Sequence, residues 1–165
     1  MLTMRSVELQ RAVVGLLREA ARDTATGGAT RAALRALSAW HVLLGPTCFA
    51  FRGCGAAAVP MAAALRQDVL DLFILACSGR ADVTPEARAL LSAAGTHAGE
   101  PRLACEVGGA LREILDGAAD GAAAALLTDD NVLERFGEVI EAQRASAASA
   151  ATATATRGML TAPSA

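Results

Sequence analysis

Cysteine and histidine are the residue types in this sequence that best suit a metal site. The chain of 165 residues has four cysteines and two histidines. A zinc site would use His41, Cys48 and Cys54, with Cys77 or Cys105 as the fourth ligand. Structural zinc sites usually place two ligands about two to four residues apart, and these gaps are wider. We therefore expect no metal and no cofactor, and we interpret the cysteines as reduced thiols of an intracellular protein.

A cysteine activated by a neighbouring histidine is the second chemistry that these residue types allow. His97 precedes Cys105 by eight residues, but a separation along the chain does not establish the contact that nucleophilic catalysis requires. We interpret His97 as a solvated loop histidine. We assign the acids Asp68 and Asp71 to a solvated helix face, and Asp129 and Asp130 to a helix N-terminus. Neither pair is assigned to acid–base catalysis. The sequence also lacks a phosphate-binding glycine loop, so we predict a protein that is not an enzyme.

Composition limits the partners that this chain would take. Its net charge of −2 does not provide the basic surface that nucleic-acid binding requires, so no nucleic acid is expected. No run of about 18 strongly apolar residues occurs, so no membrane span is expected, and the N-terminus does not resemble a signal peptide. Alanine is abundant and is the best helix former, which predicts many closely packed helices.

The segment Pro101–Leu115 is expected to be the centre of the fold. Val107 and Leu111 lie within an apolar pattern at helical spacing. The adjacent Gly108 and Gly109 cost helix stability, about 1 kcal/mol each relative to alanine, so neighbouring helices should approach closely at the glycine surface. We therefore predict that this helix is nearly buried and is wrapped by the other helices.

Caps and apolar periodicity predict the other helices. Their expected ranges are 6–23, 30–44, 60–78, 84–94, 118–127 and 128–144. On the first helix, the face expected to pack on the core contains Leu9, Val13, Leu16, Leu17 and Ala20. Trp40 is expected to be a core anchor, and residues 46–59 are ambiguous between an exposed patch and a segment that covers the core. The fold class is an all-α, compact, single-domain bundle of about seven helices around a central buried helix.

Three segments resemble the poxvirus Bcl-2-like family of host-defence inhibitors. Leu37–His41 resembles the Tyr-x-x-Trp-Arg region of that family's first helix, with Trp40 matching and His41 in place of the arginine. Ala104–Ala110 resembles the small-residue-rich central helix, and Leu126–Val132 resembles the start of a terminal helix. The Asn-Trp-Gly-Arg motif of cellular Bcl-2 proteins and a C-terminal membrane anchor are missing, as in the branch of the family that acts on innate immune signalling.

The resemblance implies a domain organisation and a function. Residues 1–29 would be an N-terminal helix and linker, and residues 30–144 a Bcl-2-like helical core. Residues 145–165 lack periodicity and are poor in large apolar residues, so composition predicts a disordered tail there. The protein would be viral and cytoplasmic in the host cell, and it would bind host signalling or apoptotic proteins to inhibit NF-κB-type signalling or apoptosis. The candidate partner-binding residues are Phe49, Phe51, Leu72 and Phe73. A homodimer is also possible for such a protein. The alternative function is that of a helical structural or assembly protein of a high-GC virus.

Overall fold

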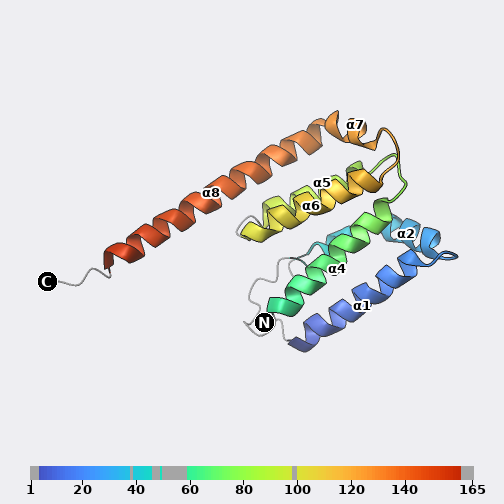
Figure 1. The fold of residues 1–165 in the computed structure, drawn as a ribbon, viewed down its shortest axis with the longest axis horizontal. Coiled ribbons are helices and arrows are strands. Elements are labelled where there is room, and N and C mark those ends of the chain that lie inside the picture. The colour runs from blue at the N-terminus through green and yellow to red at the C-terminus, as the bar shows by residue number, and fades with distance from the viewer. Residues whose placement is uncertain (1–3, 38, 46–48, 50–58, 98–99, 161–165) are drawn as a thin grey trace.

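The computed structural model describes residues 4–37, 39–45, 49, 59–97 and 100–160, which form eight helices and no strand (Figure 1). The all-α prediction is confirmed. In chain order the helices are α1 (Met4–Arg22), α2 (Gly27–Ala36), α3 (Trp40–Leu43), α4 (Val59–Cys77), α5 (Thr84–Thr96), α6 (Pro101–Gly117), α7 (Ala122–Leu127) and α8 (Asp130–Leu160).

The long helices are arranged in layers (Figure 1). α1 packs along α4, α4 packs on α6, α5 lies beside α6, and α8 packs on α5. The outermost layers, on opposite sides of the molecule, are therefore α1 and α8. The helix expected over residues 30–44 is interrupted, so α2 and the short α3 take its place and contact α4 and α5 respectively.

α4, not α6, is the most enclosed helix. Its residues Leu65, Val69, Leu72 and Phe73 are 0% exposed, because α4 packs on α1 and on α6. α4 also buries the Arg66 side chain, whose Nε donates to Oε2 of Glu106 on α6 at 2.5 Å. A helix that is apolar on more than one face is stable only where neighbours cover it on several sides.

The prediction of a nearly buried helix over residues 101–115 is therefore corrected. Val107 and Leu111 of α6 are buried, but α6 is amphipathic and exposes a polar face. Gly108 and Gly109 lie on that exposed face, and a Cβ atom added at either position would have no atom within 4 Å. The expected close approach of a neighbouring helix at the two glycines is wrong.

α1 also presents a different face to the core from the one expected. Val7, Val14 and Ala21 are buried, whereas Leu9, Val13 and Leu16 are 68%, 49% and 72% exposed. Ion pairs to α4 account for this rotation: the buried Asp68 accepts from Arg11 Nε at 2.9 Å and also contacts Arg18. A buried carboxylate requires paired charges, so both arginines lie towards α4 and Leu9, Val13 and Leu16 lie towards solvent.

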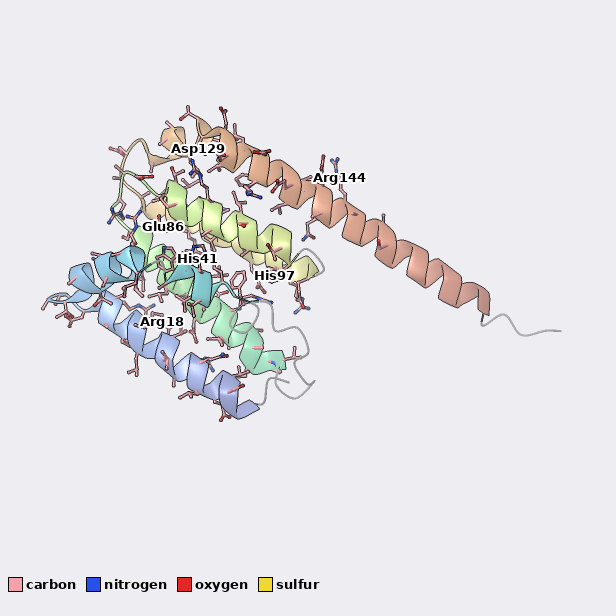
Figure 2. All side chains as sticks on the ribbon, turned by 180° about the vertical axis from the view of Figure 1, so that it is seen from behind. Arg18, His41, Glu86, His97, Asp129 and Arg144 are labelled. Atoms are coloured by element: carbon pink, nitrogen blue, oxygen red, sulfur yellow. The ribbon has the colours of Figure 1, made fainter. Side chains whose placement is uncertain are left out.

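α8 continues as a helix to Leu160, which differs from the disordered tail expected after residue 144. The segment is poor in large apolar residues, but alanine has the highest helix propensity and neither proline nor glycine interrupts it before Gly158. Figures 1 and 2 show the second half of α8 extending away from the other helices.

Within the described part of the chain, no helix combines the length and the apolar character that a membrane span requires.

Candidate functional site

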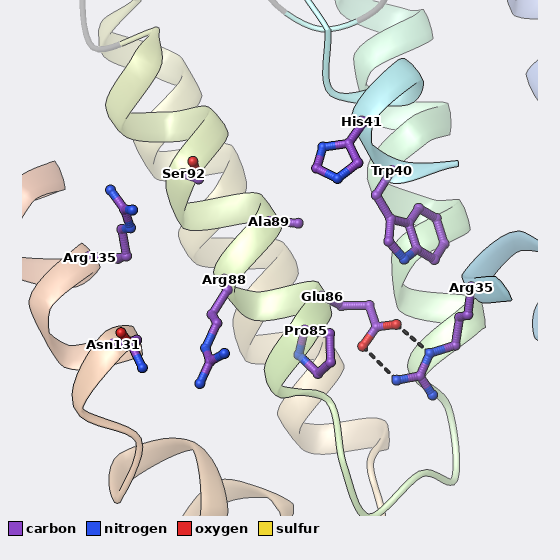
Figure 3. A pocket seen from close by; sticks show the side chains of 10 residues that line it. All are labelled: Arg35, Trp40, His41, Pro85, Glu86, Arg88, Ala89, Ser92, Asn131 and Arg135. Atoms are coloured by element: carbon purple, nitrogen blue, oxygen red, sulfur yellow. Dashed lines mark hydrogen bonds and ion pairs between the residues drawn. The ribbon is translucent and has the colours of Figure 1, made fainter. Parts of the chain in front are cut away.

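A groove of about 660 Å³ lies over α5, between α3 on one side and α8 on the other. Figure 3 shows Asn131 and Arg135 of α8 on one side and Trp40 and His41 of α3 on the other, with Ala89 and Ser92 of α5 between them. We call this the α5 groove. Its lining residues are Arg35, Trp40, His41, Pro85, Glu86, Arg88, Ala89, Ser92, Asn131 and Arg135.

The α5 groove continues towards the C-terminal end of α5. A second hollow of about 470 Å³ shares Trp40, His41, Ala89 and Ser92 with the first. It is also lined by Leu44, Gly45, Ala93, Thr96 and His97. The two hollows together follow α5 from Pro85 to His97, which is about 18 Å of helix.

A buried ion pair closes one end of the α5 groove (Figure 3). The side chain of Glu86 is 1% exposed, and its Oε1 lies 2.5 Å from Arg35 Nε. Arg35 Nη2 also donates to Glu86 Oε2 at 3.0 Å, so the contact is bidentate. The same Nη2 lies 3.4 Å from the carbonyl oxygen of Asp82. This pair joins the last turn of α2 to the first turn of α5 and holds the carboxylate beneath the groove.

Trp40 forms part of the groove wall while it anchors α3 to the core. Its side chain is 7% exposed, and its ring lies 4.0 Å from the ring of Phe73, centroid to centroid, with an interplanar angle of 38°. The prediction that Trp40 is a core anchor is confirmed. The adjacent His41 is exposed at the groove.

The α8 side of the groove carries guanidinium groups. Arg88 Nε donates to Asp129 Oδ1 at 3.3 Å and Nη2 contacts Oδ2, while Arg135 Nη1 donates to Glu138 Oε2 at 2.7 Å. The hydrogen bond from Arg88 is the main reason why the pKa of Asp129 lies below its ordinary value. The counter-ions of Arg88 and Arg135 lie outside the lining, so the lining itself presents three arginines, one histidine and only Glu86 as an acid.

The structure does not place the sequence-predicted binding residues in this groove. Phe49, Leu72 and Phe73 are 0% exposed, and Phe51 lies outside the described residues. Leu72 and Phe73 are buried because α4 packs on both α1 and α6, where burial of large apolar side chains is favourable. These three side chains are core residues.

Sequence reasoning missed Arg35, Glu86, Arg88 and Arg135 as groove residues. Glu86 follows Pro85 at the start of a helix, where its charge is explained by the helix dipole. Its partner Arg35 is 51 residues away along the chain, and no local pattern indicates that contact. The arginines lie on three different helices, so only their assembly in space identifies a common surface.

The residues considered for metal or nucleophilic chemistry are separated. Cys48 and Cys54 lie outside the described residues, and Cys105 is exposed on α6 while Cys77 is buried at the end of α4. Burial, and then the charge of Glu86, raises the pKa of the Cys77 thiol to about 12. His97 is buried, unlike the solvated histidine expected. Among the described residues, no three or more His, Cys, Asp or Glu side chains are grouped to hold a metal ion.

The chain matches no protein-family model, no curated protein and no solved structure. What the α5 groove does is therefore inferred from the residues that line it.

Proposed function

We propose that this protein is a non-enzymatic binding domain that holds a segment of a partner protein in the α5 groove. The observation that carries the proposal is the open length of the groove, from Pro85 to His97, beside two walls that come from different helices. A length of about 18 Å accommodates roughly three turns of a helix or about five extended residues. Helix-in-groove recognition uses surfaces of this kind.

The lining favours an acidic, amphipathic segment. Arg88 and Arg135 are 44% and 49% exposed, and each uses only part of its guanidinium on its own carboxylate. A guanidinium has five N–H donors, so donors remain for a carboxylate of the partner. Trp40, Pro85 and Ala89 supply apolar contact surface between the charged groups.

The family resemblance suggests which partners these are. We propose host proteins of innate immune or apoptotic signalling, bound stoichiometrically in the host cytoplasm and inhibited by occupation of their surface. Two features support this: the chain is all-helical, and Trp40 and His41, which carry part of the resemblance, both line the α5 groove.

Ser92 provides the test, because it is exposed and lines both halves of the groove. The variant Ser92→Trp fills the groove without disturbing the core. In cytokine-stimulated cells that carry an NF-κB reporter, the unaltered chain should lower reporter output and Ser92→Trp should not. The control is Ser78→Trp, an exposed serine at the end of α4, which should inhibit as well as the unaltered chain.

A photo-crosslinking amino acid at position 92 gives the direct readout. It should capture a signalling or apoptotic protein, and the same amino acid at position 78 should not. The proposal fails if the unaltered chain changes neither NF-κB output nor cell death, or if Ser92→Trp retains full inhibition.

A helical assembly protein is the second candidate, and one observation favours it. Exposed apolar side chains occur on both outer layers, on α1 and on α8. Two different apolar faces on opposite sides of a molecule allow each copy to bind two neighbours, so that copies add to one another in an open array that is not a closed ring. Light scattering at micromolar concentration separates the two functions: particle-sized species indicate an assembly protein, whereas a monomer or a dimer indicates a binding domain.

A further inference from the structure

One side of α8 carries three large apolar side chains that the described part of the chain leaves partly exposed. Leu133, Phe136 and Ile140 are 47%, 39% and 51% exposed. Their spacing, i, i+3 and i+7, is that of the seam of a two-helix coiled coil. Val132 and Val139 are buried, so the bundle covers a neighbouring side of the same helix. We call Leu133, Phe136 and Ile140 the α8 seam.

α8 is also much longer than its contact with the bundle. It has 31 residues, which corresponds to about 46 Å, and Val139 is its last buried residue in the described part. Figure 2 shows the helix continuing past Arg144 with no other helix beside it. A helix without tertiary contacts is only marginally stable in water, so a second helix along this arm would stabilise it.

The charges of α8 favour one particular second helix. Residues 130–141 contain four carboxylates and one arginine, a net charge of −3, whereas residues 142–160 contain Arg144 and Arg157 and no acid, a net charge of +2. A parallel copy of α8 would place acids beside acids. An antiparallel copy places the acidic residues 130–141 of each helix beside the far end of the other helix, which contains Arg157 and no acid, and this is favourable on both sides of the twofold axis.

We propose that α8 pairs in an antiparallel arrangement with α8 of a second copy of this chain, along the α8 seam. A twofold axis near residue 145 places Leu133–Ile140 of one copy opposite residues 150–157 of the other. That segment consists of alanine, threonine and one arginine, so Phe136 and Ile140 lie at register positions opposite a threonine and an alanine of the second copy. The same register places the turn with Glu134 opposite the turn with Arg157.

The dimer is independent of the proposed function. The α5 groove uses Asn131 and Arg135, and helical spacing places these two residues and the seam on opposite sides of the buried Val132 and Val139. Loss of the dimer therefore leaves the groove open, and a blocked groove leaves the seam free. The reporter experiment with Ser92→Trp and the experiment below can fail separately.

Sedimentation and multi-angle light scattering of the full chain test the pairing. The unaltered chain, of 16.7 kDa, should behave as a dimer at micromolar concentration. Phe136→Glu combined with Ile140→Glu should raise the dissociation constant at least about 100-fold, because two large apolar side chains lose a dry contact. The matched control is Leu127→Glu, an apolar residue of α7 that is 67% exposed and lies off the seam; it should remain dimeric.

Disulfide trapping tests the orientation. Gln143→Cys and Ala147→Cys proteins are mixed and oxidised, and the cross-linked peptides are identified by mass spectrometry. The antiparallel register predicts links between position 143 of one copy and position 147 of the other. A monomeric unaltered chain, a dimer that survives the double glutamate variant, or links that join 143 only to 143 would each overturn the proposal.

Discussion

The carboxylate of Glu86 and the guanidinium of Arg35 form a bidentate ion pair that joins α5 to α2. The distances are 2.5 Å for Oε1 to Nε and 3.0 Å for Oε2 to Nη2. Glu86 is almost fully buried, while Arg35 is 16% exposed. A buried pair adds little net stability over an apolar pair of the same shape, but each partner depends on the other for its charge to be compensated. This contact therefore determines the position of one end of the α5 groove.

Replacing Arg35 alone should destabilise the protein strongly. Arg35→Met leaves the carboxylate of Glu86 buried without its counter-ion, which should lower the free energy of unfolding by about 3–5 kcal/mol. The measurement is urea unfolding followed by circular dichroism. Replacing both partners, Arg35→Met with Glu86→Leu, should recover most of the loss.

The control for this prediction is the exposed pair Arg135–Glu138. Both side chains are about half exposed, so Arg135→Met should cost less than about 1 kcal/mol. Equal costs for Arg35→Met and Arg135→Met would mean that the Arg35–Glu86 pair does not hold α2 to α5.

Two adjacent valines test the orientation of α1. Val14 is 3% exposed and Val13 is 49% exposed. Val14→Ala leaves a cavity at the α4 contact and should lower the free energy of unfolding by about 1–3 kcal/mol. Val13→Ala is the same chemical change one residue earlier. It should change the free energy of unfolding by no more than about 0.5 kcal/mol. The opposite order in thermal or urea unfolding would show that Val13, Leu16 and their neighbours face the core after all.

Alanine at Gly108 or Gly109 should stabilise the protein. Both positions are helical and exposed, and a Cβ atom would meet nothing within 4 Å. Each substitution should raise the free energy of unfolding by roughly 0.5–1 kcal/mol, because alanine has the higher helix propensity. The measurement is again urea unfolding.

Gly27 is the contrasting glycine. A Cβ atom there would lie 2.5 Å from the carbonyl oxygen of Ala21, so Gly27→Ala should destabilise the contact between α1 and α2. A destabilising effect of Gly108→Ala comparable with that of Gly27→Ala would indicate that a neighbour does pack closely on α6.

The ion pair of Asp129 with Arg88 predicts a loss of stability in acid. The Arg88 hydrogen bond holds the pKa of Asp129 below its ordinary value of 3.8. A carboxyl whose pKa is lower in the folded state contributes stability that is complete above the unfolded value and is lost as the pH falls through the folded value. Arg88→Met should move the pKa of Asp129 towards 3.8, as measured by an NMR pH titration of the carboxyl carbons.

Asp23 is the internal control for that titration. Its pKa is also lowered, by the backbone and side-chain hydrogen bonds of Thr26 and then by the backbone of Ala25, and Arg88 is not involved. Arg88→Met should leave the Asp23 titration unchanged. If Asp129 of the unaltered chain titrates at or above 3.8, the pair with Arg88 is not formed in solution.

The sequence by itself determined the helices and several of their ends. Pro85 lies in the first turn of α5 as its type predicts, and Gly79 follows α4 with φ of +70°, the conformation that a C′ glycine supplies. These features are local: a helix is built from hydrogen bonds four residues apart, so a short stretch of sequence contains the information. The alanine-rich end of α8 obeys the same local rule, although its lack of apolar residues favoured disorder.

Only the tertiary structure decided which helix lies at the centre, which face of α1 is buried and where a groove forms. Burial is a property of two surfaces, and the second surface is far away in the sequence: Asp68 on α4 orients Arg11 and Arg18 of α1. Glu86 likewise meets Arg35 only because the end of α2 lies beside the start of α5. Local periodicity ranks the faces of one helix by apolar content, but a buried charge on its neighbour can reverse that ranking, because an uncompensated charge costs more than an exposed leucine.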